Sequence, residues 1–387
     1  MRGSLFALLA IVSLALSAMG TARATAHIRV ADDPEQQLRA AVAATLRRNV
    51  RRQPPLVFPS PAYGNPFLRD SFWAAQALGD RRFAVSVLDA FAANERADGD
   101  PPTWFGYLYT RPVYHDDESA ALLLIWAWRN RLLYDAPPPR PQLQRALDYL
   151  LRRTFGGGTL ITPAGDYADW WDAYVWPSSS TLSYTQGLYA VAVRCARLLG
   201  LTLPPHTIAK TEAAYRSLYN PRLGYLPLSN RLDATDASAL TGEFLSLWLF
   251  KHPILSDAMA LSTLRHLTPF GAGFCVTTLP GADPRAGTNF PFTPHMSTPG
   301  DYQNGASWLL YDAITIATAG LHGWQDALPR LRARLAQEFA HGVVLREYLR
   351  TNPSLAFYTT EPPYRDVFSW DAFVLVVDEA LRQRSAG

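Results

Sequence analysis

Residues 117–155 read DESAALLLIWAWRNRLLYDAPPPRPQLQRALDYLLRRTF, and this stretch decides the fold. Its first part, residues 117–133, has the length of a helix and is very apolar. Three prolines at 137–139 interrupt the chain, and residues 141–155 then read as a helix with an arginine-rich face. A helix that is apolar all round is buried, whereas a helix with one apolar stripe lies on an outer layer. The stretch therefore predicts an inner helix followed by an outer one.

The same alternation continues along the whole chain, where helical spacing predicts about twelve helices. Their expected ranges are 33–50, 80–94, 117–133, 141–155, 181–199, 206–219, 236–250, 256–267, 303–320, 324–341 and 366–384, with an apolar and aromatic segment at 65–78. Strand signals are short and fall at 159–161 and 274–278. Two concentric helical layers are expected, in an all-α (α/α)6 toroid. A two-layer solenoid is the alternative, although no fixed-period repeat is present.

The N-terminus has the layout of a secretory signal peptide. Arg2 precedes an apolar run over residues 5–16, and small residues around Ala24 and Ala26 fit a cleavage site. The run is shorter than the roughly 20 residues that a membrane span needs. We expect residues 1–26 to be removed and the protein to be periplasmic or secreted; an uncleaved anchor is the alternative. No linker divides residues 27–387, so we expect one domain there.

The composition allows a large core and argues against several functions. Hydrophobic residues make up 48% of the chain, and the net charge is +3 without a basic cluster. Nucleic-acid binding is not expected, because it requires clustered lysine and arginine. Cys195 and Cys275 could pair in an oxidising compartment, or Cys195 is a buried thiol. No zinc-type spacing is present, and we expect no metal and no cofactor.

Aromatic residues are abundant, with 11 Trp, 18 Tyr and 18 Phe. Many lie beside Asp, Asn, Gly and Pro in segments that read as loops. The longest stretch without a helix, residues 268–302, contains several of them, and loops of this length are usually functional. Flat sugar faces stack on aromatic rings while sugar hydroxyls need polar partners. The composition therefore predicts a carbohydrate substrate.

Two acidic clusters lie at expected helix starts. Arg69 and Asp70, beside Trp73, could hold adjacent sugar hydroxyls, or Asp70 could cap the helix. Asp116 and its acidic neighbours at 117–118 suit the N-terminus of a helix because of its dipole. A metal site at this second cluster is a weaker alternative.

Two further clusters carry the candidate catalytic acid and base. Asp169 and Asp172 flank Trp170 and Trp171. A carboxyl group against indole loses solvation, and its pKa rises, as a general acid requires. A structural turn with aromatic packing is the alternative. Glu347 precedes an aromatic loop and is either a base or a solvated loop residue.

Six segments, in this order, resemble the six-hairpin glycosidases. They are LRDSF at 68–72, the helix at 116–128, DWWD at 169–172 with YTQGLY at 184–189, YQNGASW at 302–308, REY at 346–348 and FSWDA at 368–372. The nearest resemblance is to alkaline/neutral invertases and to related glucosidase, mannosylglycerate-hydrolase and debranching-enzyme glucosidase domains. It spans residues 60–380, and its most specific element is Asn-Gly-x-x-Trp. Gln303 stands where that family has His.

The resemblance implies an inverting glycoside hydrolase of an oligo- or polysaccharide. In it, Asp172 protonates the leaving oxygen, Glu347 activates a water, and Asp169 is the alternative acid. Such carboxyl groups are about 6.5–9.5 Å apart. The residues expected to bind the sugar are Arg69, Asp70, Trp73, Asp116, Trp170, Trp171, Gln186, Tyr302, Gln303, Asn304, Trp308 and Trp370.

Two other functions use the same toroid. A polysaccharide lyase or sugar epimerase would act through His115, His295 or Tyr302. A non-catalytic glycan-binding protein would keep the cleft without the acid and base.

Overall fold

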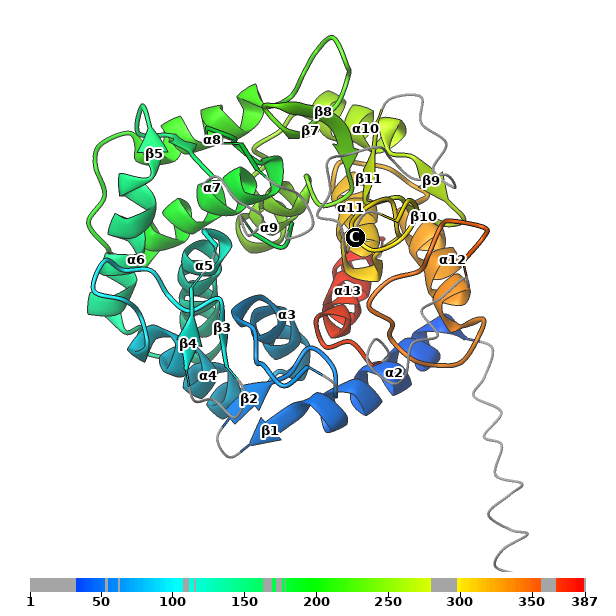
Figure 1. Ribbon diagram of the computed structural model, residues 1–387, viewed down its shortest axis with the longest axis horizontal. Helices are drawn as coiled ribbons and strands as arrows, with labels where there is room; N and C mark the ends of the chain where they lie inside the picture. The colour runs from blue at the N-terminus through cyan, green and yellow to red at the C-terminus, as the bar shows by residue number, and fades with distance from the viewer. Residues whose placement is uncertain are drawn as a thin grey trace, which may run out of the picture.

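The computed structural model describes residues 33–52, 55–61, 63–106, 111–114, 116–162, 169–171, 176–177, 179–279, 298–355 and 367–385. Within these ranges the chain forms twelve α-helices, α2 to α13, which close into a two-layered ring (Figure 1). The expected signal peptide lies outside the described residues, so it stays a prediction.

Inner and outer helices alternate strictly along the chain. The inner layer consists of α3 (Leu68–Leu78), α5 (Glu118–Tyr134), α7 (Ser183–Leu198), α9 (Thr241–Phe250), α11 (Leu309–Leu321) and α13 (Val374–Ser385). The outer layer consists of α2 (Pro34–Asn49), α4 (Arg81–Ala93), α6 (Arg140–Arg152), α8 (Thr207–Ser217), α10 (Asp257–His266) and α12 (Ala327–Phe339). The predicted all-α (α/α)6 toroid is confirmed.

The two layers follow from the residue pattern. In α5, ten consecutive residues from Glu118 to Ala127 are buried, because the helix packs against α3, α7 and the outer helices α4 and α6. Outer helix α6 instead buries one stripe that includes Leu143, Leu147 and Leu150. Residues three and four positions apart lie on the same face of a helix, so these side chains form one stripe.

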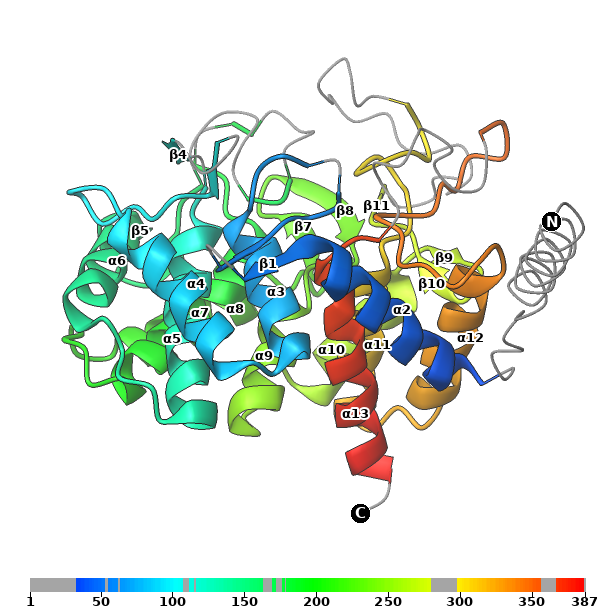
Figure 2. The ribbon, with the colours of Figure 1, turned by 90° about the horizontal axis from the view of Figure 1, so that it is seen from below.

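The ring also contains short antiparallel strands. They are β1 (Val50–Arg52), β2 (Pro55–Val57), β3 (Trp104–Phe105), β4 (Pro112–Val113), β5 (Thr154–Phe155), β6 (Thr159–Leu160), β7 (Pro227–Ser229), β8 (Leu232–Asp236), β9 (Pro269–Phe270), β10 (Gly273–Phe274) and β11 (Thr277–Thr278). Strands β11, β8 and β7 form a three-stranded sheet, and the others pair in twos. Figure 2 shows many loops at one end of the ring and the C-terminal end of α13 at the other.

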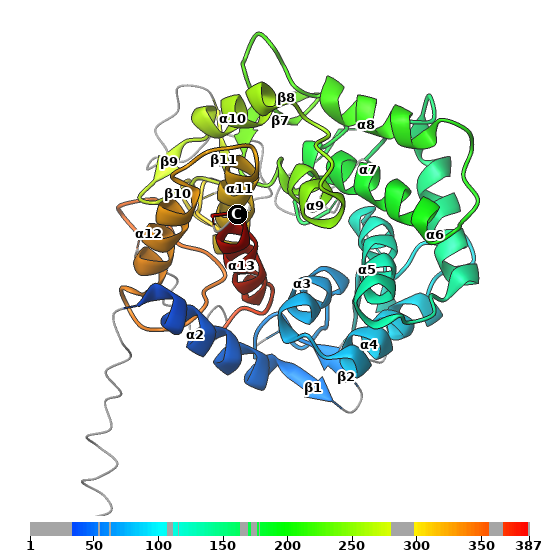
Figure 3. The same cartoon turned by 180° about the vertical axis from the view of Figure 1, so that it is seen from behind.

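The ring is closed by contacts between the two ends of the described chain. Helix α2 packs against α12, α13 and the short 3-10 helix η3 (Trp370–Phe373) (Figure 3). Arg332 on α12 binds Asp33 and Glu35 at 3.2 Å each, and Arg382 on α13 binds Glu35 at 3.0 Å. Both arginines also reach the buried Asp378, at 3.5 and 2.9 Å.

A pair of glycines allows two inner helices to touch. A Cβ atom on Gly242 of α9 would lie 2.3 Å from the Cα of Gly187 on α7. Glycine is required at such a backbone contact because it has no side chain.

The described residues include no helix with the length and hydropathy of a membrane span. Cys195 is a buried free thiol in α7, as one of the two interpretations of the sequence expected.

Candidate active site

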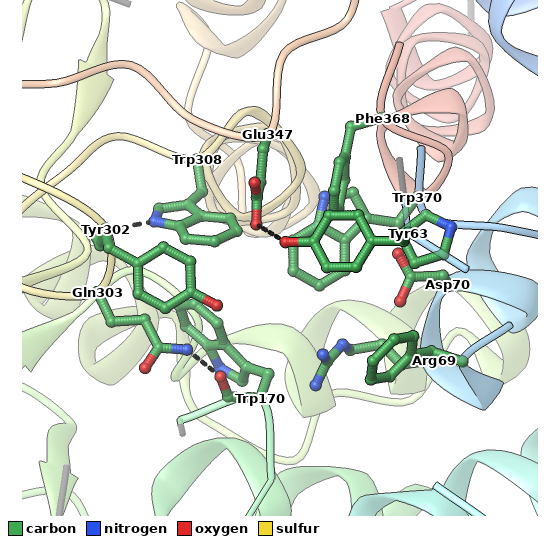
Figure 4. A pocket seen from close by; sticks show the side chains of 12 residues that line it. Tyr63, Arg69, Asp70, Trp170, Tyr302, Gln303, Trp308, Glu347, Phe368 and Trp370 are labelled. Carbon is green, nitrogen blue, oxygen red and sulfur yellow. Dashed lines mark hydrogen bonds between the residues drawn. The ribbon is translucent and has the colours of Figure 1, made fainter. Parts of the chain in front are cut away.

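A cavity of about 60 Å³ opens at the end of the ring where the inner helices begin. Its walls come from segments far apart in the sequence, which the ring brings together (Figure 4). The lining residues are Pro59, Tyr63, Phe67, Arg69, Asp70, Trp170, Tyr302, Gln303, Trp308, Glu347, Phe368 and Trp370.

Aromatic rings form most of the wall. Trp308 packs edge to face against Trp170, Tyr302 and Trp370, with ring centroids 5.4, 5.2 and 5.5 Å apart. Each such pair contributes about 0.5–1.5 kcal/mol beyond the burial of its area. Because the contacts interlock, the rings hold one another in fixed orientations around the cavity.

Glu347 projects into this aromatic wall from the loop that follows α12 (Figure 4). Its side chain is only 2% exposed. The Tyr63 hydroxyl donates a hydrogen bond of 3.2 Å to its Oε1. A carboxylate held in this way is available to accept a proton from a water in the cavity.

Arg69 and Asp70 enter the cavity from the first turn of α3. Arg69 binds the buried Glu118 at 2.6 Å, and its guanidinium lies 5.1 Å from the ring centroid of Trp370. Burial raises the pKa of Asp70 to about 6, although the neighbouring Arg69 opposes this shift. Burial likewise raises the pKa of Glu118 well above its usual value, against the effect of Arg69.

Asp169 and Trp170 lie on the loop before α7. Asp169 accepts hydrogen bonds from the Trp171 amide at 2.7 Å and from Thr185 at 2.5 Å. Burial raises the pKa of Asp169, and these two hydrogen bonds oppose it. The Trp170 indole donates to Ser238 at 3.2 Å, and Gln303 donates to the Trp170 carbonyl. Trp170 is thereby fixed at both its ring and its backbone.

The site thus combines a fixed carboxylate with carboxyl groups whose pKa values are raised. A raised pKa keeps a carboxyl group protonated nearer to neutral pH, so that it can donate a proton. Carboxylates also gather here because the inner helices present their N-terminal ends to this side, and helix dipoles favour negative charge there. The arrangement is suited to acid–base chemistry on a neutral polar molecule.

The structure brings eight of the residues predicted from sequence into the cavity wall. They are Glu347, Arg69, Asp70, Trp170, Tyr302, Gln303, Trp308 and Trp370. Asp172, the first choice for the acid, lies outside the described residues, as do His115 and His295.

Other predicted residues do not line the cavity. Trp73 is buried against Phe72 and Phe373. The Gln186 side chain accepts a hydrogen bond from the Leu160 amide in β6 and donates one to the Thr211 carbonyl in α8. Asp116, Asp169, Trp171 and Asn304 are buried but are not part of the wall. Asp116 accepts a hydrogen bond of 3.0 Å from the Ser119 amide at the N-terminus of α5, the end of a helix whose dipole favours acidic residues.

Four wall residues were missed by sequence reasoning, namely Pro59, Tyr63, Phe67 and Phe368. Tyr63 and Phe67 belong to a loop rich in Pro, Gly and Asn before α3, and that composition marks a loop which can carry function. In the described parts of the chain, no group of three or more His, Cys, Asp or Glu side chains could hold a metal ion.

No protein-family model matches this sequence, and a search of curated proteins finds no relative. Solved structures do share its fold. A glycosidase in complex with glucose aligns with a TM-score of 0.62 at 14% identity, over 90% of this chain and 97% of its own.

Two further structures are similar. The GH63 mannosylglycerate hydrolase from Thermus thermophilus, in complex with glucose, has a TM-score of 0.61 at 16% identity, over 88% of this chain and 99% of its own. A rhamnosidase from Klebsiella oxytoca with rhamnose bound has a TM-score of 0.65 at 12% identity, over 90% of this chain and 64% of its own. The predicted resemblance is confirmed at the level of the fold: the chain has the (α/α)6 fold of these glycosidases.

Proposed function

We propose that this protein is an exported glycoside hydrolase that cleaves by inversion. The observation that carries the proposal is the position of Glu347, a buried carboxyl group in an aromatic wall that the buried Asp70 also lines. Aromatic rings bind sugar faces, and a pair of carboxyl groups is what most glycosidases use for cleavage. The glycosidases that share the fold support the same conclusion.

In the proposed reaction, Glu347 is the general base. It takes a proton from a water as the water oxygen attacks the anomeric carbon. A carboxylic acid on the opposite face gives its proton to the glycosidic oxygen, whose bond to that carbon breaks. Attack opposite to the leaving group inverts the anomeric configuration and requires carboxyl groups about 6.5–9.5 Å apart. We assign the acid to Asp172, with Asp169 as the alternative.

Arg69 and Asp70 are assigned to substrate binding. The guanidinium of Arg69 offers N–H donors for sugar oxygens, and Asp70 exchanges hydrogen bonds with sugar hydroxyls. Trp170, Trp308 and Trp370 provide the apolar contacts. The remaining predicted residues are buried and do not line the cavity, so we assign them no direct contact with the sugar; they are Trp73, Asp116, Trp171, Gln186 and Asn304.

The first experiment is a substrate panel with the purified protein beginning at residue 27. The names of the similar structures suggest glucosides, mannosides and rhamnosides of both anomers, as 4-nitrophenyl glycosides and as oligosaccharides. NMR spectra recorded within minutes identify the first anomer released. Hydrolysis with inversion supports the proposal, whereas retention contradicts the mechanism. An ultraviolet-absorbing unsaturated product identifies a lyase, and binding without turnover identifies a glycan-binding protein.

The second experiment removes the proposed base and acid. Glu347→Gln and Asp172→Asn should each lower kcat by about 10²–10⁴-fold, the range that a general acid or base contributes. Glu379→Gln, at a half-exposed position on α13, controls for loss of one carboxylate. Full activity in Glu347→Gln would refute the assignment of the base. Mass spectrometry of the protein recovered from the periplasm or medium tests export, which predicts loss of residues 1–26.

A further inference from the structure

A network of buried charges lies behind the cavity wall and joins outer helix α12 to inner helix α11. Arg334 on α12 binds Asp312 on α11 at 2.7 Å and Glu338, one turn along α12, at 2.8 Å. All three side chains are fully buried. None of them lines the cavity.

One end of this network holds the chain immediately before Glu347. The Arg346 amide donates a hydrogen bond of 2.9 Å to the Glu338 carboxylate. The Arg346 guanidinium donates to the backbone carbonyls of Glu338 at 2.6 Å and His341 at 3.0 Å. The residue preceding the proposed base is therefore tied to α12 by both its backbone and its side chain.

The other end of the network holds the chain just after Glu347. Asp312 accepts a hydrogen bond of 2.7 Å from the Ser307 hydroxyl. Ser307 in turn pairs with Leu349 through two backbone hydrogen bonds of 2.9 and 2.8 Å. Asp312 also accepts from the Phe274 amide at 2.8 Å, which fixes its carboxylate from a third side.

We propose that Glu338, Arg334 and Asp312 form a positioning unit that sets the place of the Glu347 carboxylate. The contacts make a closed circuit in which Glu338 holds Arg346, Asp312 holds Ser307 and thus Leu349, and Arg334 joins the two acids. Glu347 lies between the two attachment points of this circuit, one residue after Arg346 and two residues before Leu349. The inference rests on the proposed function, because it concerns the base of that reaction.

Stability alone does not explain the network. Burying two acids and an arginine carries a large desolvation cost, and well-packed apolar residues often serve stability as well or better. Helix α12 already buries Leu331, Leu335 and Phe339 against the core. A displacement of about 1 Å at a catalytic group can cost about 100-fold in rate. Charged hydrogen bonds between fixed partners hold the segment that carries Glu347 in one position more precisely than apolar packing does.

The test compares three variants with wild type. Glu338→Gln keeps the size of the side chain but removes its charge, and Ser307→Ala removes only the hydroxyl that joins Leu349 to Asp312. Glu243→Gln is the matched control, since Glu243 is equally buried and accepts backbone hydrogen bonds from Ile254 at 3.0 Å and Leu255 at 2.9 Å. It lies outside the cavity wall.

We expect Glu338→Gln to lower kcat by about 10–100-fold and Ser307→Ala by several-fold, with KM within about twofold of wild type. Both should be measured with the best 4-nitrophenyl glycoside of the panel and normalised to folded protein. Glu243→Gln should lower the melting temperature without lowering kcat. A crystal structure of Glu338→Gln or, if that variant does not fold, of Ser307→Ala should show the Glu347 carboxylate displaced from its wild-type place.

The outcomes separate the two proposals. An unchanged kcat together with an unmoved Glu347 carboxylate in the folded variants overturns the positioning role. If Glu347→Gln itself keeps full activity, the assigned base is wrong while the crystallographic readout still tests the positioning unit. If kcat in Glu243→Gln falls as far as in Glu338→Gln, the effect is general destabilisation and the positioning role is rejected.

Discussion

Asp236 illustrates how a single carboxyl group behaves behind the site. It is fully buried at the end of β8 and accepts hydrogen bonds from the Ser238 amide and hydroxyl. Burial raises its pKa to about 8, although these hydrogen bonds oppose the shift. Ser238 also receives the Trp170 indole hydrogen bond, so Asp236 supports the cavity wall from one layer away.

We predict that Asp236 makes the fold less stable as the pH rises. The folded state holds the Asp236 proton more tightly than the unfolded chain does. The stabilisation that this group contributes is therefore complete below about pH 4 and is lost as the pH rises through about 8. One pKa unit corresponds to about 1.4 kcal/mol, and the whole shift to an amount on the order of 5 kcal/mol. Asp236→Asn, which can still accept from the Ser238 amide, should remove this loss.

Thermal unfolding of wild type and Asp236→Asn between pH 5 and 9 provides the measurement. The melting temperature of the variant relative to wild type should rise across this range. Asp135→Asn, at the exposed end of α5, controls for loss of one negative charge. A difference that stays constant with pH would count against the buried-charge explanation.

Which side chains point into the cavity could be predicted only in part. Arg69, Asp70 and Glu347, which the sequence clusters singled out, do lie in the cavity wall. Trp73 was expected there as well, but it lies one helical turn below Arg69 and so reaches the core beneath the cavity. Tyr184 on α7 packs edge to face against Trp170 of the wall. Gln186 is two residues further along, and about 200° of helical rotation turns it toward Thr211 on outer helix α8. Sequence spacing does not show where the wall ends.

At the scale of elements, the alternation of apolar and amphipathic helices predicted two helical layers, for which a closed ring was the simplest arrangement and a solenoid the alternative. The starts of three helices were placed too early. Helix α13 begins at Val374, not 366, because the 3-10 helix η3 precedes it. Helix α9 begins at Thr241, not 236, because Asp236 ends β8. Helix α11 begins at Leu309, not 303, because Tyr302 and Gly305 take positive φ values of 45° and 102° that a helix does not allow. Strands of two to five residues are too short to show alternation, which is why β7 and β8 were missed.

The contact between α7 and α9 leads to a prediction for Gly242→Ala. The added methyl group would meet the Cα and the carbonyl carbon of Gly187 at 2.3 and 2.4 Å, and two packed helices cannot separate without disturbing the layer. Overpacking of this kind costs about 1–3 kcal/mol, sometimes more. Chemical denaturation should show a loss of at least this size. A variant as stable as wild type would mean that the helices do not touch here.

At the scale of the molecule, the cluster of Arg332, Arg382, Glu35 and Asp378 closes the ring. We predict that Arg332→Met lowers the free energy of unfolding by about 1–3 kcal/mol, because it leaves the buried Asp378 with fewer partners. Arg131→Met removes an arginine from an exposed pair with Asp135 and should change stability by less than about 1 kcal/mol. Urea unfolding of both variants tests this, and equal effects would show that ring closure does not depend on the cluster.

The closure of the ring also determines the order in which the protein can fold. The bond between Asp33 and Arg332 joins residues 299 positions apart. A solenoid can add one repeat after another as its chain emerges, whereas α2 has no complete partner surface until the last helices have been synthesised. Contacts at such long sequence separation slow folding. The nascent chain therefore stays incompletely folded until its synthesis is finished, and an incompletely folded chain is also the form that can be threaded through a membrane during the proposed export.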